Sequence, residues 1–235
     1  MRVGLQTIPW GPVIEDLPAL ARAVKKIGYD GIEVAQTVKT LGTPAHLKLV
    51  LDQAGVALVG LAGGSLVDRL EFAESCRPAY LYIDEWDQQP VQTAFDRGMS
   101  VGMHPHVYKT ISTFAAAERY LQQFPMLSLI PDTAHLYLAG ETFVDGLKRN
   151  IDRVIAVHLK DWTSRFGRSP ARYARGFAAL GQGELGTILE ETVRFLVDAE
   201  FEGWVIVEQD SPDGGDPLKG AGVSRDWLEK HGIDS

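Results

Sequence analysis

The chain has 235 residues, 45% of them hydrophobic and 23% charged, a composition typical of a globular protein with a sizeable core. We therefore expect residues 1–235 to form one domain. The formal net charge is -8 and Lys and Arg form no long cluster, which argues against nucleic acid as a partner.

Short apolar runs alternate with segments of helical spacing along the whole chain. A strand at 3–7 precedes a helix whose apolar residues recur from Leu17 to Ile27 and stop at Gly28. Further strands are predicted at 31–34, 56–61, 79–83, 99–103, from 127, at 154–157 and at 204–207. Further helices are predicted at 44–54, 66–76, 90–97, 113–123, 143–151, 188–199 and 224–231. Eight strands, each followed by a helix, favour a closed parallel (β/α)8 TIM barrel.

Residues 162–183 break this alternation. The segment contains four Arg and four Gly without sustained periodicity, and it is long for a plain connection. Long connections of this kind are usually functional. We expect the segment to cover a site.

Three apolar runs end in residues that bind metal ions or move protons. They end at Asp132, His158 and Glu208, and parallel strands of a barrel bring such ends together at one rim. Two carboxylates and an imidazole suit a divalent ion such as Mn²⁺, Mg²⁺, Co²⁺ or Zn²⁺. The alternative is that each residue forms a salt bridge or a cap at its own strand end.

Other polar residues at the same rim are candidates for binding the substrate. His135 lies three residues after Asp132 and is a candidate hydrogen-bonding group or proton carrier. The remaining candidates are His104 and His106, which flank a proline and suit substrate or metal, Glu33 at the end of the second strand, and Lys160. Lys160 would contact an anionic or carbonyl oxygen, unless it is a solvated lysine. Asp161 is either a partner of the site or a cap.

Five motifs together carry a family resemblance. They are His104-Pro105-His106, Pro131–His135, Val157–Asp161, Leu180–Glu184 and Gly203–Asp210. In this order the chain resembles the sugar phosphate isomerase and epimerase superfamily, which has the xylose isomerase-like TIM barrel. Within it, the chain is most similar to the branch that includes inosose dehydratase.

The resemblance implies a metal held by Asp132, His158 and Glu208, with His135 as a substrate contact. Members generally add a glutamate from the region of the fifth strand, and the aligned residue here is Ser112. This departure leaves three alternatives for the metal: weaker binding, binding through His106 or water, or no metal.

The resemblance also implies an enzyme of carbohydrate metabolism. The main expectation is a metal-dependent isomerase or epimerase, in which Glu208 removes a proton beside the carbonyl of a sugar or polyhydroxy ketone and forms an enediolate. The first alternative is a dehydratase or β-eliminating lyase acting on a keto sugar, keto cyclitol or keto glycoside, with His135 or His104 as the acid. The second is a non-catalytic barrel that serves as a binding or complex subunit.

The cysteine count and the N-terminal pattern predict where the protein is located, and the loop lengths bear on its assembly. The single cysteine cannot form an internal disulfide, and the N-terminus has a strand pattern rather than that of a signal peptide, so we expect a cytoplasmic protein. No apolar run approaches the roughly 20 residues of a membrane-spanning helix. The partner expected is a small carbohydrate. The region of strands three to five is compact, so a pocket completed in a homo-oligomer is a further expectation.

Overall fold

A ring of parallel strands forms the centre of the protein. The computed structural model describes residues 1–210 and 215–234. Its eight-stranded sheet has the order β6-β5-β4-β3-β2-β1-β10-β7, and a parallel bridge between Leu129 and Val154 joins β6 to the chain before β7. The strands are β1 Arg2–Gln6, β2 Gly31–Thr37, β3 Ala57–Gly63, β4 Tyr80–Ile83, β5 Val101–Met103, β6 Leu127–Leu129, β7 Ala156–Leu159 and β10 Trp204–Val207. This arrangement confirms the predicted TIM barrel.

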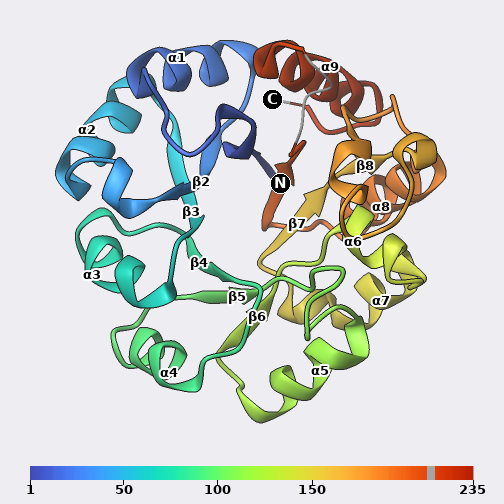
Figure 1. The fold of residues 1–235 in the computed structure, drawn as a ribbon, viewed down its shortest axis with the longest axis horizontal. Helices are drawn as coiled ribbons and strands as arrows, with labels where there is room; N and C mark the ends of the chain where they lie inside the picture. Colours follow the sequence, from blue (N-terminus) through green and yellow to red (C-terminus); the bar gives the residue numbers. More distant parts are fainter. Residues whose placement is uncertain (211–214, 235) are drawn as a thin grey trace.

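Helices surround the strands on the outside of the ring (Figure 1). They are α1 Leu17–Ile27, α2 Pro44–Ala54, α3 Leu66–Cys76, α4 Gln88–Asp96, α5 Phe114–Gln123, α6 Thr133–Leu138, α7 Phe143–Asn150, α8 Gly186–Asp198 and α9 Pro217–Lys230. Local chemistry sets the ends of α1, because Asp16 accepts a hydrogen bond from the Ala19 amide and Gly28 adopts the left-handed conformation with φ 102. Among the helices of the described residues, none is long and apolar enough to cross a membrane.

The glycine at position 60 makes room inside the barrel for a polar pair. A Cβ at Gly60 would lie 2.6 Å from the Tyr80 ring and 3.1 Å from the Glu33 side chain. Both of these side chains are buried, at 1% and 0% exposure. The absence of a side chain on β3 therefore lets β2 and β4 place Glu33 and Tyr80 against each other.

Three parts of the fold differ from the sequence-based prediction. Helix α9 begins at Pro217 rather than at 224, with Asp216 as its N-cap, and the short helix α6 was not predicted. The segment 162–183 is more ordered than a plain loop. It contains the antiparallel pair β8 Asp161–Trp162 and β9 Phe177–Ala178, and the short 3₁₀ helices η4 Ser164–Phe166 and η5 Tyr173–Gly176.

Candidate active site

Buried polar side chains meet at the carboxyl ends of the barrel strands. His104 follows β5, Asp132 follows β6, His158 lies in β7 and Glu208 follows β10. Each is at most 5% exposed. A parallel bridge pairs Asp132 with His158, and the Glu208 amide donates to the Leu159 carbonyl at 3.2 Å. The backbone of neighbouring strands therefore fixes these positions, as the sequence predicts.

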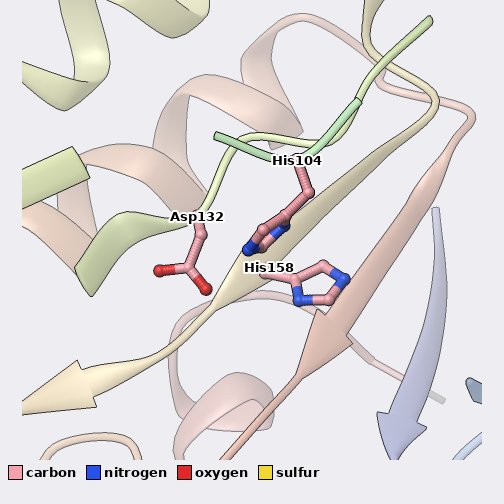
Figure 2. Close-up of side chains that lie close together, drawn as sticks. All are labelled: His104, Asp132 and His158. Atoms are coloured by element: carbon pink, nitrogen blue, oxygen red, sulfur yellow. The ribbon is translucent and has the colours of Figure 1, made fainter. Parts of the chain in front are cut away.

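Three of these residues offer ligand atoms to a common point. One atom each from His104, Asp132 and His158 lies within 4.8 Å of the others, and Figure 2 shows the three side chains pointing toward one another. Both ring nitrogens of His104 and one Asp132 oxygen (Oδ2) are buried without a hydrogen-bond partner among the described residues. Burial, followed by the neighbouring His158, holds the pKa of His104 well below its usual value, so its ring is neutral and offers a lone pair.

Glu208 is engaged by two cationic side chains. Its Oε2 lies 2.6 Å from Nδ1 of His158, and its Oε1 lies 2.7 Å from Nζ of Lys160. Burial alone would raise the pKa of Glu208, but Lys160 and His158 hold it well below its usual value. Glu208 is therefore ionised at neutral pH.

Lys160 is buried rather than solvated. Its Nζ lies 2.9 Å from Asp210, 3.7 Å from Asp132 and 4.4 Å from the centre of the Phe177 ring. Burial alone would lower the pKa of Lys160, but Asp210, Glu208 and Asp132 raise it above its usual value. The side chain is therefore an ammonium ion that compensates the buried carboxylate of Glu208.

His158 stands between two carboxylates. Its Nδ1 faces Glu208, and its Nε2 lies 3.3 Å from Glu33. Burial alone would lower the pKa of His158, but Glu33 and Glu208 raise it to about 10. In the metal-free protein the ring is therefore an imidazolium ion.

His135 is held as a neutral imidazole of defined tautomer. Its Nε2 lies 3.3 Å from the Lys160 ammonium. An ammonium can only donate, so Nε2 accepts and Nδ1 carries the hydrogen. Burial, followed by Lys160, holds the pKa of His135 well below its usual value. His106 packs on the His135 ring with centroids 3.8 Å apart. Its assignment to substrate or metal stays a prediction.

The segment 162–183 lies against these side chains, as predicted for a covering segment. The Tyr173 ring is 6.2 Å from His135 and 6.4 Å from His106, centre to centre. The Phe177 ring is 5.6 Å from His135. The Tyr108 hydroxyl donates to the Arg168 carbonyl and so ties the segment to the loop after β5.

Glu33 lies inside β2 rather than at its end, because β2 continues to Thr37. This corrects the predicted strand boundary. The Glu33 carboxylate accepts from Gln6 Nε2 at 2.6 Å and from the Tyr80 hydroxyl at 2.5 Å. Its assignment to substrate binding stays a prediction.

Two further predictions concern the loops. Asp161 is a cap, because its carboxylate accepts from the amides of Trp162, Gly181, Gly183 and Leu185. Ser112 is half-buried just before the N-cap of α5, and the β5 region supplies His104 to the ligand group.

Two residues of the site, Asp210 and Tyr82, have no role predicted from the sequence. Asp210 pairs with Lys160, and burial, opposed by Lys160 and reinforced by Glu208, raises the pKa of Asp210 to about 8. The available signal for Asp210 is its place in the short polar run that follows β10, after Glu208 and Gln209. Tyr82 packs on His104 with ring centroids 4.7 Å apart. The signal for Tyr82 was the two-residue period that it shares with Tyr80 on β4.

Known proteins with related sequences include inosose dehydratases. The inosose dehydratase of Clostridium botulinum (strain Alaska E43 / Type E3) is 26% identical over 151 residues, which cover 59% of this chain and 50% of that protein. The chain therefore matches about half the length of this relative.

Two solved structures share the fold over nearly the whole chain. The apo 3-keto-D-glucoside 4-epimerase YcjR from E. coli has a TM-score of 0.75 at 17% identity and covers 98% of this chain and 99% of its own. The IolI protein with a bound zinc atom has a TM-score of 0.79 at 15% identity and covers 98% of both chains. Residues 90–231, more than half of the chain, match the profile of the family described as xylose isomerase-like TIM barrel. The chain belongs to the xylose isomerase-like TIM barrel family.

Proposed function

We propose that this protein is a metal-dependent dehydratase acting on a keto cyclitol or keto sugar. The observation that carries the proposal is that a carboxylate and a neutral imidazole contact the same ammonium ion. Lys160 Nζ lies 2.7 Å from Glu208 and 3.3 Å from His135. One buried cation thus contacts both the proposed base and the proposed acid. The inosose dehydratase relatives support the same reaction class.

The side chains present fit a divalent ion. His104, Asp132 and His158 would hold it, and Glu208 is next to His158 as a further ligand. The buried Asp132 oxygen and the two His104 nitrogens, which lack hydrogen-bond partners among the described residues, support this fit. Once bound, the ion would polarise the substrate carbonyl and make the neighbouring C–H more acidic.

Glu208 is the proposed base. It is held as the carboxylate anion, which is the form that can accept the proton on the carbon beside the carbonyl. The electron pair of that C–H bond moves toward the carbonyl and gives an enediolate.

His135 is the proposed acid. Its Nδ1 carries a hydrogen and has no hydrogen-bond partner among the described residues. As that hydrogen goes to a β-hydroxyl, Lys160 passes a proton to Nε2, so the His135 ring stays neutral. The C–O bond breaks, water leaves, and the enediolate electrons form the carbon–carbon double bond as the carbonyl is restored. Lys160 then regains a proton from Glu208, which it also contacts, so both of these residues return to their starting charge. His135 is left with its hydrogen on Nε2, and proton exchange with solvent restores the starting tautomer.

Isomerisation or epimerisation, the main expectation from the sequence, shares the first step. Epimerisation also requires a group that returns a proton to the opposite face of the same carbon. The resemblance implies a glutamate in the β5 region for that purpose, but the chain has Ser112 there and presents His104 to the site. One base and one acid favour elimination.

The test is the product formed from a panel of keto cyclitols and keto sugars by the metal-loaded protein. We expect mass spectrometry to detect loss of one water, and NMR to detect a new carbon–carbon double bond. The His135→Gln variant should lose this product, whereas His46→Gln, at an exposed position on α2, should retain it. An isomer or epimer of unchanged mass as the only product would contradict dehydration. No conversion and no proton exchange with any substrate would favour the non-catalytic alternative.

A further inference from the structure

Glu33 has no room for a ligand of its own. It is 0% exposed, and three side chains surround its carboxylate. Oε1 accepts from Gln6 at 2.6 Å, Oε2 accepts from the Tyr80 hydroxyl at 2.5 Å, and Nε2 of His158 lies 3.3 Å from the carboxylate. A substrate hydroxyl would have to displace one of these donors.

Gly60 on the neighbouring strand β3 leaves room for Glu33 and Tyr80 to contact each other. A Cβ at Gly60 would lie 3.1 Å from the Glu33 carboxylate and 2.6 Å from the Tyr80 ring, so a side chain on β3 would push the pair apart. The Tyr80 hydroxyl and the Gln6 amide both donate to Glu33 from within the barrel. Gln6 and Tyr80 therefore hold the Glu33 carboxylate in place, and His158 is its third side-chain partner.

We propose that Glu33 is a positioning residue, which holds Nε2–H of His158 and thereby makes Nδ1 the nitrogen that binds the metal. The inference rests on the proposed function only in taking His158 as a ligand. An imidazole that binds a metal through one nitrogen commonly donates the other N–H to a carboxylate, which fixes the tautomer and the ring orientation. Nδ1 faces Glu208, the other proposed ligand, at 2.6 Å, whereas Nε2 faces Glu33, whose carboxylate already accepts from Gln6 and Tyr80.

This assignment replaces the substrate-binding role predicted for Glu33. Glu33 and Glu208 flank the same imidazole but differ in surroundings. Glu208 contacts Lys160 and is next to the Asp132 and His104 group, whereas Glu33 contacts only Gln6, Tyr80 and His158 through the side-chain hydrogen bonds of the described residues. Glu208 can therefore act on metal and substrate, while Glu33 acts through His158.

The test is ¹⁵N NMR of the histidine rings, together with zinc titration of the full-length protein. In the zinc-loaded wild type, Nδ1 of His158 should be bound to zinc, and Nε2 should carry a slowly exchanging proton. Glu33→Gln should weaken zinc binding about 10- to 100-fold and speed exchange of that proton while the circular dichroism spectrum is unchanged. Glu202→Gln, at an exposed glutamate, is the matched control and should change neither quantity. Tyr80→Phe leaves the Glu33 carboxylate in place and should give a smaller loss.

Zinc bound through Nε2, or an unchanged zinc affinity and Nε2–H exchange rate in a folded Glu33→Gln protein, would overturn the assignment. If Glu33→Gln does not fold, Tyr80→Phe is the variant to measure. A zinc affinity and an Nε2–H exchange rate equal to those of the wild type would then overturn the assignment. If the wild type binds no zinc, the proposed metal-dependent function fails separately. In that case the Nε2–H signal of His158 is measured in the metal-free protein. Slow exchange that is lost in Glu33→Gln supports the contact between His158 and Glu33, and fast exchange in the wild type overturns it.

Discussion

The Lys160 ammonium lies 2.7 Å from the Glu208 carboxylate, and both side chains are buried at the carboxyl ends of the strands. A third partner, Asp210, lies 2.9 Å from the same ammonium. A buried charge without a partner is strongly unfavourable, so each of these groups depends on the others. The proposed base is therefore part of a charge network that affects both stability and chemistry.

Replacing Lys160 with Met should destabilise the protein, because it leaves the buried Glu208 carboxylate without its cation. We expect a loss of about 3–5 kcal/mol in the free energy of unfolding, measured by urea denaturation. Lys48→Met is the control, because Lys48 pairs with Asp52 at 2.6 Å on the surface, and such pairs contribute about 0–1 kcal/mol. Equal losses in the two variants would argue that the buried network is not important for stability.

The stability of the metal-free protein should fall as the pH rises from about 6.5 to about 10. The pKa of His158 is raised to about 10 in the folded protein, whereas an unperturbed imidazole has a pKa of about 6.5. In this range the folded state binds the proton and the unfolded state does not. The contribution is therefore complete below pH 6.5 and is lost toward pH 10, with a slope of up to about 1.4 kcal/mol per pH unit.

Urea denaturation at a series of pH values, with a chelator present, measures this slope. In His158→Gln the slope over the same range should be smaller, since the titrating group is gone. A wild-type stability that is flat over this range would show that His158 has an ordinary pKa in the folded protein.

Divalent ions should raise the melting temperature, because a ligand that binds only the native state stabilises it by mass action. His158→Ala and His104→Ala should each reduce this rise, since both residues belong to the candidate ligand group. His46→Ala, on the exposed face of α2, should retain the full rise. An unchanged rise in His158→Ala would remove His158 from the metal site.

The sequence predicts elements where local chemistry determines them. The apolar spacing of α1, with Asp16 before it and Gly28 after it, suffices to place that helix. The sequence does not predict helix α6, because Asp132 after an apolar run indicates a strand-end ligand, although its Oδ1 also accepts from the His135 amide as an N-cap. The start of α9 at Pro217 was missed because Gly220 and Gly222 interrupt the helical pattern, although Asp216 and Pro217 are a typical cap and first turn.

The sequence predicts which residues of the site lie at strand ends, but it does not predict the hydrogen bonds and ion pairs among them. Asp132, His158 and Glu208 follow apolar runs, and the fold brings them to one rim. The partners of Lys160 depend on how side chains from three strands point, and the sequence alone left a solvated lysine open. The same holds for Glu33, whose contacts with Tyr80 and Gln6 arise only when β1, β2 and β4 pack around Gly60.

Ser112→Glu tests the departure from the superfamily pattern. If the backbone at this half-buried position directs the side chain into the site, the added carboxylate should tighten divalent-ion binding, measured by titration calorimetry. The same change should introduce slow epimerisation by supplying a base on the opposite face. No gain in affinity in a folded variant would show that Ser112 does not occupy the position of the missing glutamate. His104 would then be the residue that takes its place.

The most direct test of the central claim is the exchange of the substrate proton beside the carbonyl with solvent deuterium, followed by NMR in the metal-loaded protein. The wild type should exchange this proton, and Glu208→Gln should fold normally but lose the exchange, because a neutral amide cannot accept the proton. Glu202→Gln should exchange like the wild type. Wild-type exchange in Glu208→Gln would contradict the assignment of Glu208 as the base.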